Sequence, residues 1–445
     1  MSILAAIYTI AFIFIIIFSF TRPKIGLALF IVYFLFVPRI KLQLGPISIG
    51  EKFIYLVFIF SFIIKYGKKI KGIDYSFYKP FFFLYTSIFF IILCQNSNTF
   101  GSSLNYFLTT ILSSLLYPMI VYSILITEKS AIRTCLTTIT ICYIIITAYG
   151  LFLITMPGIN PYLMVSLPIF GLEFNEAYAL GYSALDTNVH VTAAEGRLFG
   201  RISSVFAHPL QYGLVLVFFA CTLFYANRKN KLKLILITLA TLIAIVTSGS
   251  RTPVAAIFIT VIISCIFTGK IKYMLLCLTA IVLLLLLSFI VFPETIENYI
   301  LTIVNSNESN IQGSNVEMRM NQLQGCFDII KYCFWEGKGY SWTYDYLAGH
   351  DIHPKLLNFE SLIFIVLCNT GMLGIIVWGI FIWLYTKKSL QIRQIPQRML
   401  ILSLFFFYIT FACITGEYEY MKYFMLFYSF ALAIIQTSNL KKTLR

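Results

Sequence analysis

Apolar runs of about 15 to 25 residues recur along nearly the whole chain and alternate with short polar segments. Within a run, apolar and polar residues do not alternate, so the pattern predicts membrane-spanning helices and not the strands of a membrane barrel. The predicted spans are residues 2–20, 24–38, 52–65, 80–95, 104–126, 132–155, 209–227, 232–247, 252–268, 272–292, 359–384, 398–414 and 420–437. The predicted fold class is an all-α polytopic integral membrane protein with about 12–13 transmembrane helices.

Composition supports this prediction. Of the 445 residues, 59% are hydrophobic and only 11% are charged, which is more apolar surface than a soluble chain could bury. No charged segment precedes the first run and no small-residue cleavage site follows it. We therefore expect that run to be a membrane helix and not a cleaved signal peptide.

The basic residues predict the topology. Lysine and arginine concentrate in KYGKKIKG, NRKNKLK, KKSLQIRQIPQR and the KKTLR tail, which the positive-inside rule places in the cytoplasm. The net charge of +15 then reflects topology, and no nucleic-acid partner is expected. Arg39, Lys41 and Lys52 break the rule, which leaves the N-terminal topology open.

This topology leaves two large loops outside, at residues 156–208 and 293–358. They separate N-terminal helices (1–155), central helices that include Arg251 (209–292), and C-terminal helices with a cytoplasmic tail (359–445).

The second loop contains one predicted helix. Met320, Leu323, Phe327, Ile330 and Phe334 recur at spacings of three and four, so they form a stripe expected to rest on the helix bundle or the membrane mouth. A glycine-punctuated turn, EGKGYSW, follows. Cys326 and Cys333 are two helical turns apart, about 10 Å, which is too far for a disulfide between them.

Four arginines near span ends are candidates for anion binding. Arg251 lies in TSGSRTP, where hydroxyls and a helix N-terminus favour an anion, although an arginine at a span end can also be an interface anchor. Arg197 and Arg201 would share one face of a helical turn and could instead pair with acidic residues in the same loop. Arg319 begins the loop helix.

Three residues before or at the eleventh span are candidates for proton transfer. His350 and His353 could serve as an acid or a base, as imidazoles often do, but surface or hydrogen-bonding roles are the alternative. Glu360 begins an apolar run, where desolvation favours a base, although a glutamate there can also stabilise the helix dipole. No metal-ligand spacing is present, so neither a metal nor another cofactor is expected.

Three stretches resemble the bacterial O-antigen polymerases and O-antigen ligases. They are RLFGRISSVFAHPLQYG, TSGSRTP, and the segment from Arg319 through GKGYSW to Glu360. The ligase signature is His, then Asn, Ser or Gln, nine residues, Gly, two residues and Gly. This chain has Glu360 and Ser361 at the start, with Gly371 and Gly374 at the matching positions. Glutamate in place of the histidine favours a polymerase.

The resemblance implies a glycosyl transfer on the periplasmic face of the bacterial inner membrane. A polymerase moves the growing glycan from undecaprenyl diphosphate to the non-reducing end of a lipid-linked repeat unit. Converging arginines would stabilise the departing diphosphate without a metal, and backside attack would invert the anomeric carbon. Expected partners are lipid-linked glycan repeat units, membrane lipids, and a chain-length regulator and flippase of the same pathway.

On this basis the site residues are assigned as hypotheses. Glu360, with His353 or His350 as second choices, serves as the base. The residues expected to bind diphosphate or sugar are Arg251, Arg201, Arg197, Arg319, Tyr340 and Trp342; packing at the membrane interface is the alternative for the two aromatics. The alternative functions are an O-antigen ligase, which moves glycan to lipid A-core, a lipid-linked oligosaccharide flippase, and a membrane O-acyltransferase.

Overall fold

The computed structural model describes residues 3–37, 41–44, 47–70, 72–95, 100–156, 160–169, 202–206, 208–269, 316–349 and 353–443, with residues 272, 275 and 279. The N-terminal half contains α1 (Ile3–Thr21), α2 (Pro23–Phe36), β1 (Lys41–Leu44), β2 (Ile47–Gly50), α3 (Glu51–Ile70), η1 (Ser76–Tyr78), α4 (Lys79–Cys94), α5 (Phe100–Ile111), the π-helix η2 (Leu112–Leu116), α6 (Tyr117–Thr127), α7 (Lys129–Phe152), η3 (Leu153–Thr155) and α8 (Pro161–Ile169). The C-terminal half contains α11 (Pro209–Asn227), α12 (Lys231–Thr247), α13 (Arg251–Thr268), α16 (Val316–Ile330), α17 (Trp342–Ala348), α18 (Leu362–Leu390), α19 (Ile395–Thr415), η5 (Tyr418–Tyr420) and α20 (Met421–Thr443).

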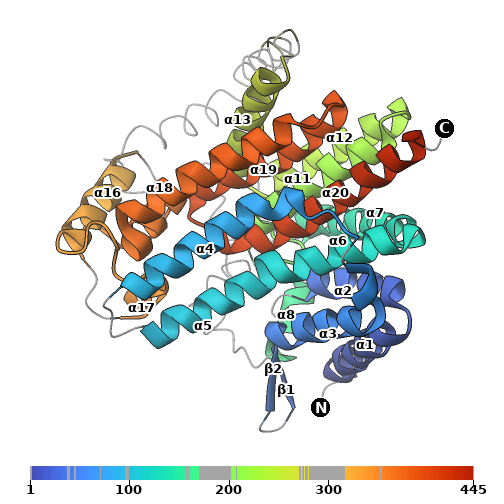
Figure 1. Cartoon of the computed structure of the whole chain (residues 1–445), viewed down its shortest axis with the longest axis horizontal. Helices are drawn as coiled ribbons and strands as arrows, with labels where there is room; N and C mark the ends of the chain where they lie inside the picture. The colour runs from blue at the N-terminus through green and yellow to red at the C-terminus, as the bar shows by residue number, and fades with distance from the viewer. Residues whose placement is uncertain are drawn as a thin grey trace.

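The all-α fold class is confirmed: long helices run side by side along the molecule (Figure 1). The described residues depart from it at one place, an antiparallel hairpin in which Lys41 of β1 pairs with Gly50 of β2. Within the same part of the chain, seven helices are long and apolar enough to cross a membrane. Twelve of the thirteen predicted spans coincide with described helices, and the span at 272–292 lies outside the described residues except at positions 272, 275 and 279.

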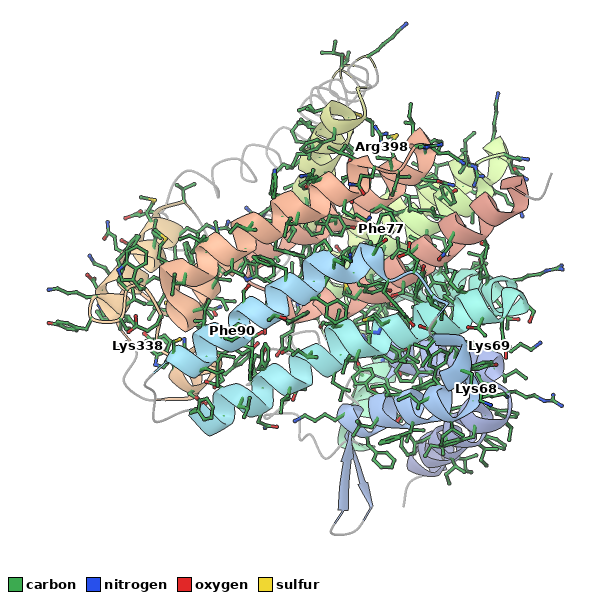
Figure 2. The ribbon with its side chains drawn as sticks, viewed as in Figure 1. Lys68, Lys69, Phe77, Phe90, Lys338 and Arg398 are labelled. Atoms are coloured by element: carbon green, nitrogen blue, oxygen red, sulfur yellow. The ribbon has the colours of Figure 1, made fainter. Side chains whose placement is uncertain are left out.

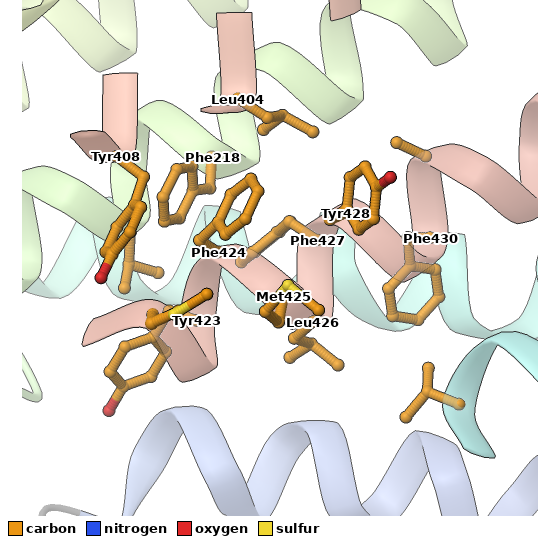
Figure 3. Packing of buried hydrophobic residues seen from close by; sticks show 14 of the residues in the cluster. Phe218, Leu404, Tyr408, Tyr423, Phe424, Met425, Leu426, Phe427, Tyr428 and Phe430 are labelled. Carbon is orange, nitrogen blue, oxygen red and sulfur yellow. The ribbon is translucent and has the colours of Figure 1, made fainter. Parts of the chain in front are cut away.

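Aromatic rings fill the centre of the bundle. The Tyr385 ring of α18 stacks on Phe405 of α19, with ring centroids 3.7 Å apart. Phe424 of α20 packs among the neighbouring aromatic side chains (Figure 3). Tyr78, at the end of η1, shares a 2.8 Å hydrogen bond with Ser429 of α20. Stacked rings of this size bury large apolar areas, so this region holds the helices in a fixed arrangement.

The two ends of the bundle differ. One end carries α16 and α17, and we call it the loop end (Figure 1). Lys338 lies there, whereas Lys68 and Lys69 lie at the opposite end (Figure 2). Lys52, at the start of α3, donates to Asn105 of α5 at 3.1 Å, and the hydroxyl of the adjacent Tyr106 lies 2.9 Å from that of Tyr344 in α17. Lys52 is therefore at the loop end, away from the other basic loops.

Helix α16 lies where the sequence predicted a helix in the second loop. Only part of the predicted apolar stripe is buried, however. Cys326 and Ile330 are fully buried, together with Gln322, whereas Met320 is 52% exposed and Phe327 45% exposed. The reason is the close approach at Gly325, where an added Cβ would lie 2.9 Å from Leu356 Cβ. That contact rotates the Gln322–Cys326 side of α16 toward the bundle. Most of the predicted loop at 156–208, and residues 293–315 of the second loop, lie outside the described residues.

Candidate functional site

Glu360 lies where the second loop meets α18. It directly precedes Ser361, the N-cap of α18, whose hydroxyl accepts from the Ile363 N–H at 3.2 Å. The Glu360 N–H donates to Gln322 Oε1 of α16 at 3.3 Å. Glu360 Oε2 and Gln322 Nε2 are both buried, and neither has a hydrogen-bond partner among the described residues. Buried polar atoms usually have partners, so two orphaned atoms in contacting residues favour a place where a ligand group completes the hydrogen bonding.

Arg319 reaches the same junction from α16. Its Nη2 donates to the carbonyl of Ile414, near the end of α19, at 2.8 Å. Gly416, two residues later, is the C-cap of α19, and its φ is 76°. A Cβ at Gly416 would overlap the carbonyl oxygen of Phe359, so only glycine lets the end of α19 lie against the residue before Glu360. The structure thus brings Arg319 and Glu360 to one junction of α16, α18 and α19.

Glu417, in the sequence GEYEY, is a carboxyl group at this junction that the sequence reasoning missed. It follows Gly416, is partly buried, and hydrogen-bonds Tyr420. Burial, and secondarily the charge of Glu419, raises the pKa of Glu417 to about 7. The available signal in the sequence was a pair of acidic residues, Glu417 and Glu419, in the short turn between two apolar spans. A carboxyl with this pKa can exchange a proton near neutral pH.

Arg251 is the first residue of α13, and the turn before it is tightly formed. Gly249 has a φ of 63°, and the Ser250 N–H donates to Ser248 Oγ at 3.3 Å. Ser250 is the N-cap of α13 but makes no side-chain cap hydrogen bond. The first N–H groups of a helix favour an anion. TSGSRTP therefore forms the turn and helix start that the sequence predicted.

A series of contacts links this turn to the loop end of α20. Pro253 packs so closely on α11 that a Cβ at Gly213 would lie 2.5 Å from Pro253 Cγ. Two residues earlier, Gln211 donates to the hydroxyl of Tyr423, in the first turn of α20. Arg251 is therefore on the same end of the bundle as Glu417.

Helix α18 is broken at Gly371, whose φ of 64° and ψ of −161° are not helical. The loop after α16 fills the break with four backbone hydrogen bonds. Met372 N donates to Phe334 O at 2.9 Å and Leu373 N to Trp335 O at 3.1 Å, while Lys338 N donates to Cys368 O at 2.8 Å and Gly339 N to Asn369 O at 3.2 Å. The EGKGYSW turn is thus bonded into α18, which satisfies backbone groups that a broken membrane helix would otherwise expose.

His353 lies against α16. Its Nε2 is 3.8 Å from Asp328 Oδ2, its Nδ1 accepts from the Lys355 N–H at 3.3 Å, and its own N–H donates to the Tyr346 hydroxyl at 2.6 Å. These contacts match the hydrogen-bonding alternative for this histidine. His350, Arg197 and Arg201 lie outside the described residues.

The two aromatic candidates are packed against other rings. Tyr340 is only 5% exposed, and its hydroxyl is 2.9 Å from that of Tyr418. Burial raises the pKa of Tyr340 to about 12. The Trp342 ring lies 4.7 Å from that of Tyr346 and 6.3 Å from that of Phe359. Both rings therefore support the loop that carries them, in line with the packing alternative.

Comparison with known proteins identifies part of the chain. Residues 234–379 match a family model described as O-antigen ligase. The match covers 146 of the 445 residues and makes this segment similar to the O-antigen ligase family. No curated protein and no solved structure shows significant similarity to the chain. With its apolar helices, the match supports a multi-pass membrane protein that transfers glycan in the manner of an O-antigen polymerase or ligase, and it gives no support to a flippase.

The segment that matches the O-antigen ligase model contains Arg251, Arg319 and Glu360, and it ends within α18 beyond Gly374. Glu417 lies outside it. In the described part of the chain, no group of three His, Cys, Asp or Glu residues is placed to hold a metal ion. A metal-free reaction stays a prediction.

Proposed function

We propose that the protein is an O-antigen polymerase that transfers the growing glycan from undecaprenyl diphosphate to the non-reducing end of a lipid-linked repeat unit. The observation that carries the proposal is the junction of α16, α18 and α19. There Arg319 contacts the end of α19, Glu360 contacts Gln322 of α16, and the Glu360 carboxylate has a buried oxygen without a partner among the described residues. Glutamate at this position, where the ligase signature has histidine, favours the polymerase over the ligase.

In the proposed reaction, Glu360 accepts the proton of the acceptor hydroxyl. The hydroxyl oxygen forms a bond to the anomeric carbon as the bond from that carbon to the diphosphate oxygen breaks. The electron pair leaves with the lipid diphosphate, and attack from the opposite side inverts the anomeric configuration. Arginine binds phosphate through two parallel N–H donors, so Arg319 and Arg251 stabilise the charge that develops on the leaving group without a metal.

In the proposed arrangement, the loop end lies at the periplasmic face of the bacterial inner membrane. The basic loops near Lys68 and Arg393 then face the cytoplasm, as the positive-inside rule requires. The lipid-linked substrates enter from the surrounding bilayer. A chain-length regulator and the flippase that delivers repeat units are the expected partners.

The first test of the proposal replaces Glu360 in a strain whose own gene is deleted. Glu360→Gln removes the proton acceptor and keeps the shape, so we expect long glycan chains to be lost while the protein still reaches the membrane. Glu317→Gln is the matched control, because Glu317 is an exposed glutamate at the start of α16. Wild-type chain length in Glu360→Gln, measured on gels of the surface glycan, would remove Glu360 from the site.

The same strain separates polymerase from ligase. Loss of a polymerase leaves single repeat units attached to the lipid core, whereas loss of a ligase leaves the core bare and polymer on the carrier lipid. Arg251→Ala should give the polymerase pattern. Arg251→Lys distinguishes the roles of this residue: retained chain length indicates an anchor or point charge, and loss indicates two-pronged phosphate binding.

A further inference from the structure

A polar hollow of about 120 Å³ lies at the loop end, on elements outside the segment that matches the ligase model. We call it the hydroxyl hollow. It is lined by residues of α3, α5, η2, η5 and α20: Lys52, Tyr55, Tyr106, Thr109, Thr110, Ser113, Ser114, Tyr418, Glu419 and Lys422. A volume of this size holds on the order of ten non-hydrogen atoms, which is the size of one sugar ring.

The walls present many hydroxyl oxygens in a protein that is mostly apolar. Thr109 and Thr110 donate to the carbonyls of Asn105 and Tyr106 at 2.7 and 3.0 Å, and Ser113 donates to the Thr110 carbonyl at 3.3 Å. Because each hydroxyl proton is used within its own helix, the oxygen lone pairs remain to accept from a ligand. Ser113 and Ser114 both lie in the π-helix η2, and such widened turns occur frequently at functional sites.

Three charged groups complete the lining. Lys52 donates to Asn105, and the Lys422 ammonium lies 5.8 Å from the centre of the Phe34 ring. Glu419 accepts hydrogen bonds from the hydroxyls of Tyr106 and Tyr344 at 3.1 and 2.9 Å. The hollow thus combines two cations with one carboxylate. Lys52 is also one of the basic residues that break the positive-inside rule, and a ligand for it at the loop end explains that exception.

We propose that the hydroxyl hollow binds a monosaccharide unit that carries a carboxylate, such as a uronic acid, within the glycan substrate. The lysines pair with the sugar carboxylate, and Glu419 and the wall oxygens accept from the sugar hydroxyls. A diphosphate suits the hollow less well than a uronic acid, because it brings more negative charge next to Glu419 and offers no sugar hydroxyls to the wall oxygens. The inference rests on the proposed glycan transfer for its substrate, but binding can be measured without turnover.

The test measures thermal unfolding of the purified full-length protein in detergent with glucuronate, glucose or inorganic pyrophosphate at matched ionic strength. Glucuronate should raise the melting temperature of the wild-type protein, and glucose and pyrophosphate should not. Lys52→Met and Lys422→Met each remove a charge-assisted contact worth about 1.5–3 kcal/mol, so each should weaken the apparent affinity at least about tenfold.

Lys355→Met is the matched control. Lys355 is also exposed at the loop end, and its ammonium also donates to a side-chain amide, Gln324 Oε1, at 3.0 Å. It should leave the glucuronate response unchanged. An equal response to glucose, a response to pyrophosphate alone, or a glucuronate response that survives Lys52→Met would overturn the proposal. Because Lys52 is exposed, its replacement leaves folding intact, and none of these outcomes depends on Glu360 or on polymerisation.

Discussion

Replacing Gly371 with alanine should open the junction between α18 and the loop that precedes it. The φ of 64° and ψ of −161° at Gly371 belong to a region that only glycine adopts freely, and an L-residue there costs about 1–3 kcal/mol. The new Cβ would also overlap Trp335 O and lie 2.7 Å from Gly337 N, so the loop would have to move. Loss of the four hydrogen bonds that fill the break adds about 0.5–1.5 kcal/mol each.

We therefore expect Gly371→Ala to lower the free energy of unfolding by at least about 2 kcal/mol and to reduce glycan chain length. The assays are thermal unfolding in detergent and gel analysis of the surface glycan. Gly379→Ala is the matched control in the same helix. An added Cβ there has nothing within 4 Å, so it should be neutral or stabilise by about 0.5–1 kcal/mol. Equal melting temperatures for the two variants would refute this account of the break.

Two further predictions concern the ends of α16 and α19. Arg319→Met removes a charged donor from Ile414 O and should lower the free energy of unfolding by about 1.5–3 kcal/mol. Arg319→Lys keeps a charged donor and should recover part of that loss. An unchanged melting temperature in Arg319→Met would contradict a stabilising role for this hydrogen bond. The pKa of Glu417 is raised from 4.5 to about 7, so the folded protein favours the neutral carboxyl and loses stability as pH rises from about 4.5 to 7. Glu417→Gln stays neutral, so its free energy of unfolding should match that of the wild type near pH 4.5 and exceed it at pH 8 by up to about 3 kcal/mol. Thermal unfolding at both pH values measures this difference. A difference that does not depend on pH would refute the raised pKa.

The helices were predictable because apolar length alone specifies a membrane span. The pattern located α13 to within one residue and α18 with an end six residues short of Leu390. The apolar pattern could not predict the break in α18 at Gly371. A glycine within an apolar run gives no sign of its backbone angles, and the loop that bonds to it ends more than 30 residues earlier in the chain.

The candidate site was predicted only in part for a similar reason. Glu360 and Arg319 were found because each is a charge at the edge of an apolar or amphipathic segment. Their shared junction depends on Gly416, which lies between α19 and α20 and lets the end of α19 approach Phe359. The role of the loop aromatics was harder to predict, since Tyr340 at the membrane surface and Tyr340 buried against Tyr418 have the same sequence signature.

The broken helix α18 also has a consequence for how the protein is made. Inserted by itself, α18 would either remain one continuous helix or leave the backbone groups at Gly371 facing lipid, at a cost of several kcal/mol for each unsatisfied group. The loop from Phe334 to Gly339 supplies four backbone partners, Gln95 Nε2 donates to Asn369 O at 2.7 Å, and both are synthesised before α18. In a nascent chain, α18 can therefore reach its final shape only after this loop has docked against it. Docking of the loop becomes a condition for assembling the C-terminal helices.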